Sequence, residues 1–137
     1  MSKIIIHGGF FSESSTNIET KIAKQQALLR IVKDSYAYLQ NHSALETVVY
    51  AVSQLEDDEL FNAGIGSQIQ SDGKIRMSAS LMDGESQKMS GVINIEEVKN
   101  PIQVAQVLMQ VDDRILGGSG ATNFARKHGF EPFSTEI

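Results

Sequence analysis

Apolar side chains at helical spacing across the first third of the chain constrain its fold most strongly. They recur three, four or seven positions apart, which places them on one face of a single long helix. Such a helix must bury that face against another element of structure. The positions concerned are Ile18, Ile22, Leu29, Val32, Tyr36 and Leu39.

A second helix is indicated directly after Asn41-His42, the pair that we expect to end the first one. Ser43 and Glu46 form an S-x-x-E capping box, in which each side chain accepts a hydrogen bond from a backbone N–H of the first turn. Apolar residues again recur at helical spacing beyond this cap. They are Leu45, Val48, Val49, Val52 and Leu55.

Several stretches are typical of strands and turns. Residues 4–6, all isoleucine, predict a buried strand that runs into a tight turn at His7-Gly8-Gly9. Asp72-Gly73, within residues 69–75, is a strong hairpin signal. Two further strands are expected at 76–82 and 89–95, joined by a turn at Asp83-Gly84.

The last third of the chain predicts two helices and a short strand. Asn100 caps a third helix that has Pro101 at its first position, and Ile115-Leu116 forms the strand. Ser119 caps a last helix, which runs through Lys127 and stops at Gly129. The buried face of the third helix should include Ile102, Ala105, Leu108 and Met109. This order of elements suits a single α+β domain over residues 1–137, with an antiparallel or mixed sheet covered by helices.

Composition excludes several kinds of function. The 137 residues carry a formal net charge of -5, and the longest basic run is Arg126-Lys127-His128, so nucleic acid is not an expected partner. The chain has no cysteine, which removes disulfides, thiolate metal sites and cysteine nucleophiles. The apolar run at 4–6 is too short for a signal sequence or a membrane span, and we expect a cytoplasmic protein. Residues 133–137 carry no stop signal, as in a chain cut within a loop.

An acidic run, residues 56–59, follows the second predicted helix. A helix C-terminus carries partial negative charge, so carboxylates there are unfavourable, and no Lys or Arg is near in sequence. Beyond it, Gly64 and Gly66 allow the chain to turn its carbonyls inward. Such a loop is a candidate for a hard cation bound by oxygen, although residue types alone favour a solvated acidic loop.

A nucleophile elbow at Ser119 is a weaker interpretation. His7-Gly8-Gly9 could supply oxyanion N–H groups, and Ser119 lies between a predicted strand and a predicted helix. The elbow requires glycine where Ala121 stands, and the only histidine after Ser119 is His128, on the same short helix. Ser119 is therefore better explained as a helix cap.

Five stretches, in order across nearly the whole chain, together resemble the plant-type asparaginase/isoaspartyl peptidase family of N-terminal-nucleophile hydrolases. They are His7-Gly8-Gly9, Leu55-Glu56 with residues 60–66 (LFNAGIG), Leu81-Met82-Asp83-Gly84, Val98-Lys99-Asn100-Pro101-Ile102, and Gly118-Ser119-Gly120-Ala121 with Asn123-Phe124-Ala125. The resemblance implies an αββα sandwich made as one precursor that cleaves itself. This chain would be its α-subunit, and a separate β-subunit would carry an N-terminal Thr as nucleophile. The implied substrates are L-asparagine and β-aspartyl dipeptides, and the implied assembly is a dimer of αβ units.

The resemblance also assigns supporting roles within this chain. No residue here is implied to be catalytic; Asn62 supports the nucleophile by hydrogen bonds, and the His7-Gly8-Gly9 turn lines the active site. The family match favours the cation site over the solvated loop, as a structural sodium ion with no organic cofactor. Its implied ligands are the main-chain oxygens of Leu55, Glu56, Asp58, Phe61, Ala63 and Ile65.

Two departures from the family pattern and three alternatives stay open. Ser78-Ala79-Ser80 begins with Ser where the family usually has Asp, which should alter local hydrogen bonding, and Phe10-Phe11 stands where small residues are common. Glycosylasparaginase and threonine aspartase are the alternatives within the same superfamily. A non-catalytic, cation-binding scaffold is the alternative from another class.

Overall fold

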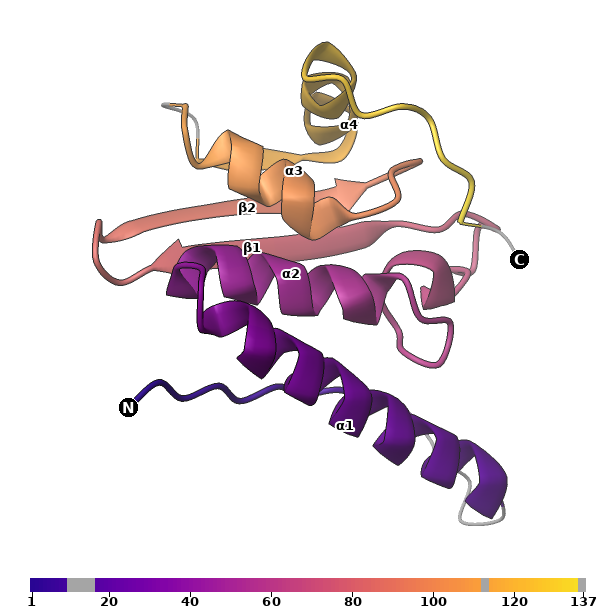
Figure 1. Cartoon of the computed structure of the whole chain (residues 1–137). Coiled ribbons are helices and arrows are strands. Elements are labelled where there is room, and N and C mark those ends of the chain that lie inside the picture. The colour runs from indigo at the N-terminus through magenta and orange to yellow at the C-terminus, as the bar shows by residue number, and fades with distance from the viewer. Residues whose placement is uncertain (10–16, 112–113, 136–137) are drawn as a thin grey trace.

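The computed structural model describes residues 1–9, 17–111 and 114–135, so that Phe10-Phe11 and the last two residues lie outside it. Within these ranges the chain forms four α-helices, one short 3-10 turn and three strands (Figure 1). In chain order they are α1 (Ile18–Leu39), α2 (Ala44–Glu56), η1 (Gly64–Gly66), β1 (Met77–Asp83), β2 (Lys88–Ile95), α3 (Pro101–Leu108), β3 (Ile115–Gly117) and α4 (Gly118–Lys127).

The strands form one mixed sheet in the order β1-β2-β3. β1 pairs with β2 antiparallel, and β2 pairs with β3 parallel. This confirms the strands predicted at 76–82, 89–95 and 115–116, and a mixed sheet. The β1–β2 ladder contains a bulge between the pairs Met77–Ile95 and Ala79–Val92. Ser78 lies at this bulge, and its hydroxyl accepts a hydrogen bond from the backbone N–H of Asn94 at 3.2 Å. The unusual serine thus contributes to the irregular pairing.

One face of the sheet is covered by helices and forms the core. Val92 of β2 packs with Val104 and Leu108 of α3 and with Ala121 and Ala125 of α4. A second cluster joins α2 to β1 and α3. It contains Val49, Leu81, Ile102, Ala105 and Met109, and the predicted buried face of α3 is thereby confirmed. α1 packs on α2, away from the strands (Figure 1).

The opposite face of the sheet is exposed and carries several large apolar side chains. Side chains alternate between faces along a strand, so residues paired in register lie on the same face. Met82 pairs with Met89, and Gly91 between Met89 and Ile93 pairs with Ile115. All four large side chains on this face are exposed: Met82, Met89, Ile93 and Ile115.

The predicted first strand is wrong. Residues 1–9 are extended without a strand partner among the described residues, and Ile5 is 94% exposed. A strand requires a neighbour to satisfy its backbone N–H and C=O groups, and this segment has none here. Ile6 contacts the cluster formed by Ala27, Ile31 and Phe61, while His7 is exposed and is not a core histidine.

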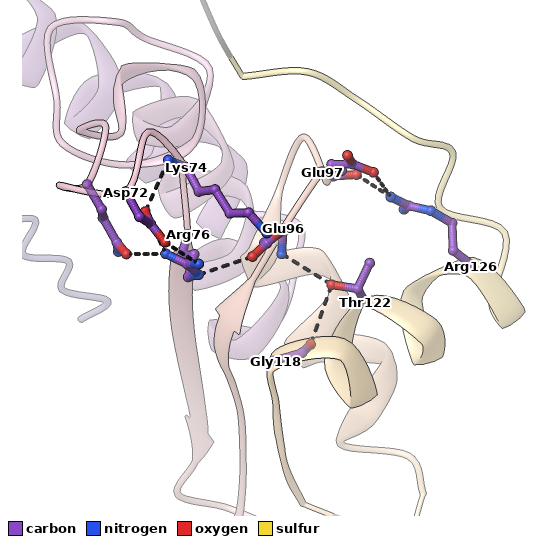
Figure 2. Close-up of polar contacts among 9 residues, drawn as sticks. Asp72, Lys74, Arg76, Glu96, Glu97, Gly118, Thr122 and Arg126 are labelled. Atoms are coloured by element: carbon purple, nitrogen blue, oxygen red, sulfur yellow. Dashed lines mark hydrogen bonds and ion pairs between the residues drawn. The ribbon is translucent and has the colours of Figure 1, made fainter.

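The predicted hairpin at 69–75 is half right. A turn does form at Asp72-Gly73, closed by a hydrogen bond from the Gln70 N–H to the Lys74 carbonyl at 2.9 Å. No strand flanks the turn within the described part of the chain. Two side chains of the turn, those of Gln70 and Asp72, also accept hydrogen bonds from Arg76 (Figure 2).

The helix boundaries follow the predictions more closely than the caps do. The capping box of Ser43 and Glu46 is present, and Gly129, at φ +83°, ends α4. Ser119 is not a cap, because α4 already begins at Gly118 with Gly117 as its N-cap. Asn100 precedes Pro101 as predicted, but its side chain makes no capping bond. None of the helices in the described ranges is long and apolar enough to cross a membrane.

Candidate functional site

The loop between α2 and β1 turns its backbone carbonyls toward two glycines. A Cβ added at Gly64 would collide with the Glu56 carbonyl oxygen, and one added at Gly66 would collide with that of Phe61. The Cβ added at Gly66 would also lie 2.8 Å from the Glu59 carbonyl oxygen, and Gly64 has a φ of +52°. No other residue type fits these two positions without moving the backbone. Together they form a cradle lined by main-chain oxygens.

The predicted cation ligands lie in this loop and at the end of α2, which includes Leu55 and Glu56. Four of the six predicted carbonyls, those of Leu55, Asp58, Phe61 and Ala63, each accept one backbone N–H of the loop at 2.8–3.4 Å. A carbonyl oxygen has two lone pairs, so each keeps one for a further partner. Within the described residues no three His, Cys, Asp or Glu side chains cluster as metal ligands.

Two carboxylates of the acidic run have basic partners in the structure, although no Lys or Arg is near them in sequence. Asp58 pairs with Arg30 of α1 at 3.2 Å. Asp57 pairs with Lys99 at 3.4 Å and accepts a hydrogen bond from the Asn100 side chain at 3.0 Å. These partners lie far away in sequence, and a local pattern could not reveal them. The cation hypothesis therefore rests chiefly on the main-chain carbonyls of this loop.

Glu56 has a structural role that its sequence position did not indicate. It is only 3% exposed, and its Oε1 accepts the backbone N–H of Ile102 at 3.0 Å. This contact caps the N-terminus of α3, where a carboxylate complements the helix dipole. Burial raises the pKa of Glu56 to about 7, although the hydrogen bond from Ile102 opposes that rise. Its Oε2 is buried with no partner among the described residues.

Asn62 is exposed, and its amide is oriented by the backbone. Its Oδ1 accepts the N–H of Gln68 at 3.1 Å. Because a backbone N–H requires an acceptor, the oxygen of the amide must face Gln68 and the NH₂ group must face elsewhere. The side chain can thus donate hydrogen bonds to a partner while its own chain holds it.

Two small cavities border Asn62. One, of about 180 Å³, contains the predicted glycine turn. Besides Asn62, this cavity is lined by the turn residues His7, Gly8 and Gly9 and by Leu55, Phe61 and Ala63. The second, of about 200 Å³, is lined on its polar side by Glu56, Ser67, Arg76 and Ser78. The structure therefore brings Asn62 and the His7-Gly8-Gly9 turn together, as the site hypothesis requires.

Gly8 connects the glycine turn to the loop that carries Asn62. A Cβ at Gly8 would lie 2.8 Å from the ring of Phe61 and 3.0 Å from Leu28, so the turn packs directly on the loop. Gly9 has a φ of +95°, which favours glycine. Sequence reasoning missed this contact, the Glu56 cap and Arg76. A lone arginine before a strand gives no signal of its own.

The structure thus combines a mixed sheet, covered by helices on one face, with an exposed Asn62 that lies between two turns containing glycine. An asparaginase family model matches residues 1–137, and the chain belongs to the asparaginase family.

Several named proteins are similar to nearly all of this chain. The chain is 49% identical over 127 residues to an isoaspartyl peptidase/L-asparaginase from Synechocystis sp., a match that covers 91% of this chain and 38% of that protein. It is 40% identical over 135 residues to a plant-type L-asparaginase from Thermococcus kodakarensis, covering 97% and 43%. A probable isoaspartyl peptidase/L-asparaginase 2 from Arabidopsis thaliana is 36% identical over 135 residues, covering 97% and 42%. The chain thus spans less than half the length of these relatives.

Proposed function

We propose that this chain forms part of a hydrolase that converts L-asparagine to aspartate and ammonia and also cleaves β-aspartyl dipeptides. The similarity to relatives named isoaspartyl peptidase/L-asparaginase, at up to 49% identity across nearly all of the chain, carries this proposal. The position of Asn62 beside the glycine turn supports it.

In the proposed reaction the nucleophile comes from a β-subunit released from the same precursor. The hydroxyl oxygen of its N-terminal Thr attacks the β-carbonyl carbon, while its α-amino group takes the hydroxyl proton. The leaving ammonia or amine takes that proton as the carbonyl reforms, which leaves a β-aspartyl ester. Water then hydrolyses the ester and restores the Thr. Asn62 would donate a hydrogen bond that holds the nucleophile or the developing oxyanion.

The exposed apolar face of the sheet supports the proposed αββα sandwich. A sheet with one apolar face uncovered requires a second layer, and four large side chains lie on that face here: Met82, Met89, Ile93 and Ile115. A sheet of the β-subunit would supply the second layer. The unpaired extended segment 1–9 would then gain the neighbouring strand that it lacks in this chain.

A sodium ion in the 55–65 loop is likewise a proposal. The main-chain cradle around Gly64 and Gly66 fits a hard cation, since carbonyl oxygens are its preferred ligands. The ion would be held by main-chain oxygens of Leu55, Glu56, Asp58, Phe61, Ala63 and Ile65. Its contribution would be to stiffen the loop that carries Asn62.

The proposal also includes an assembly and a location, and it ranks the alternative functions. A dimer of αβ units and a cytoplasmic location stay predictions from the resemblance and from the sequence. The relatives reported above are named for asparaginase and isoaspartyl peptidase activity, so we place these activities ahead of those of a glycosylasparaginase, a threonine aspartase or a non-catalytic scaffold.

The proposal can be tested on the product of the complete gene. We expect self-cleavage into two chains, with Thr at the new N-terminus by mass spectrometry, and release of aspartate from both substrate types. Turnover restricted to glycosylated asparagine would instead indicate a glycosylasparaginase, and cleavage of protein chains a threonine aspartase. An intact protein with no hydrolytic activity would support the scaffold.

A further inference from the structure

Arg76 is the centre of a polar network beside the Asn62 loop (Figure 2). Its Nη1 donates to Gln70 Oε1 at 2.7 Å, its Nη2 donates to Asp72 Oδ2 at 2.7 Å, and its Nε lies 3.1 Å from Glu96 Oε1. The guanidinium therefore uses all three nitrogens, two toward the 67–75 segment and one toward the end of the sheet. Such a fork geometry is specific to arginine.

Glu96, which Arg76 contacts at the end of the sheet, is itself bound to α4. Glu96 directly follows β2, and its backbone N–H donates to Thr122 Oγ1 of α4 at 3.2 Å. Figure 2 shows this chain of contacts from Arg76 through Glu96 to Thr122. Asp72 is ionised at neutral pH, since the hydrogen bond from Arg76 lowers its pKa to about 2. Arg76 thus ties an irregular turn to the sheet.

That same turn orients Asn62. The N–H that holds the Asn62 amide oxygen belongs to Gln68, two residues before Gln70. The turn closes on itself through Gln70 and Lys74 but has no regular secondary structure. Its other ionic tie, from Lys74 to Glu96, is longer, at 3.9 Å, and more exposed. Arg76 also lines the second cavity beside Asn62.

We infer that Arg76 is a positioning residue for Asn62: by clamping residues 70–72 to the end of β2, it fixes the Gln68 N–H that sets the direction of the Asn62 amide. This inference rests on the proposed function, in which Asn62 faces the reacting groups. It assigns to Arg76 an effect on turnover that is transmitted through Asn62 and through no contact with substrate.

A double-mutant cycle on the mature, self-cleaved protein tests the inference. Arg76→Met removes the clamp, and kcat and KM for a β-aspartyl dipeptide are measured in the parent and in Asn62→Ala. We expect kcat to fall roughly ten-fold in the parent, less than the ~100-fold that a 1 Å misplacement can cost. In the Asn62→Ala background the same change should lower kcat less than about two-fold, because the group it positions is gone. Arg76→Lys should restore part of the loss, since lysine keeps the charge but not the fork.

Arg126→Met is the matched control. Arg126 also binds near the end of β2, where it donates to the Glu97 carbonyl at 2.7 Å (Figure 2). It donates as well to the Phe130 carbonyl beyond α4 at 3.0 Å, and among the described residues it makes no hydrogen bond or ion pair with the 67–75 segment. Its loss should leave kcat unchanged. If Arg76→Met does not fold, Asp72→Ala at an exposed position removes the Asp72 contact of the clamp, should lower kcat by a smaller factor, and is measured in both backgrounds.

The outcomes separate this inference from the proposed function. A parent without turnover overturns the proposed function and the inference together. If Asn62→Ala slows turnover but Arg76→Met and Asp72→Ala do not, the inference alone is wrong. It is also wrong if the Arg76 and Asn62 effects multiply independently, because Arg76 would then act by another route.

Discussion

Glu56 near the end of α2 caps α3: its carboxylate accepts the Ile102 N–H at 3.0 Å, although 46 positions separate the two residues. Its backbone carbonyl oxygen meanwhile closes on Gly64. One residue thus joins α2, the start of α3 and the loop that carries Asn62. The side chain and main chain of Glu56 hold different neighbours, so substitutions of the side chain test the first contact without deleting the second.

Glu56→Ala should destabilise the mature protein by about 1–3 kcal/mol, because a buried N–H of α3 loses its acceptor. Glu56→Gln keeps the amide oxygen as an acceptor and removes the buried charge, so it should cost much less. Chemical denaturation with a linear-extrapolation fit measures both. Equal losses in the two variants would contradict a capping role for the Oε1 atom.

The pH dependence of stability should carry a contribution from Asp72. The hydrogen bond from Arg76 lowers the pKa of Asp72 in the folded state to about 2, below the ordinary value of 3.8. The contribution is therefore complete above pH 3.8 and is lost as the pH falls through about 2. Parent and Asp72→Asn should differ in melting temperature by a constant amount above that window and converge below it. A difference that persists unchanged to the lowest pH would show that the pair contributes through shape and not charge.

The cation proposal predicts that sodium stabilises the mature protein. A ligand that binds only the folded state adds about 1.4 kcal/mol for each ten-fold rise in its free concentration above Kd. The melting temperature should therefore rise when sodium replaces a bulky organic cation at equal ionic strength. Identical melting curves in the two salts would remove the support for the site.

A pair of glycine variants, one in the loop and one as its control, tests where the cation binds. Gly64→Ala forces a Cβ onto the Glu56 carbonyl at a positive φ, so it should both destabilise the loop and abolish the sodium response. Gly84→Ala has no atom within 4 Å of the added Cβ and should keep the parental response. A sodium response in Gly64→Ala equal to that of the parent would place the ion elsewhere.

The sequence predicted those elements whose signals are local. Apolar spacing and the Ser43–Glu46 box located α1 and α2 closely, and β1, β2 and α3 were placed within one or two residues. The first strand failed because strand formation depends on a partner, which residues 1–9 do not have here. The Ser119 cap failed because the helix begins one residue earlier, at Gly118.

In the candidate site, too, local motifs predicted some residues but not the distant partners that hold them. Asn62 and the glycine turn were predicted from motifs, and in the structure they line one cavity. The partners that fix the site come from distant segments: Arg30 and Lys99 for the acidic run, Ile102 for Glu56. No local pattern contains such pairs, because tertiary packing alone brings them together.

Asn62 supplies the most direct test of the active-site hypothesis. A threonine nucleophile must keep its hydroxyl aimed at the β-carbonyl and its amine free to accept a proton. A neutral amide suits this holding role because it donates hydrogen bonds without perturbing the pKa of the amine. The Gln68 N–H fixes the Asn62 oxygen at 3.1 Å, which leaves the NH₂ group as the donor. Asn62→Ala should therefore slow turnover of β-aspartyl dipeptides by roughly 10–1000-fold while the mature protein stays folded.

Asn62→Asp separates donation from shape. Aspartate keeps the acceptor for Gln68 but loses the NH₂ donor, and its negative charge should raise the pKa of a nearby amine. We expect turnover to fall at least as far as in Asn62→Ala, with the pH–rate profile shifted toward higher pH, because the raised amine must still be deprotonated to act as a base. Self-cleavage, followed by gel electrophoresis, should also slow in both variants, since the same threonine performs it. Normal maturation and parental kcat in both variants would leave Asn62 as a turn residue that accepts a hydrogen bond from Gln68.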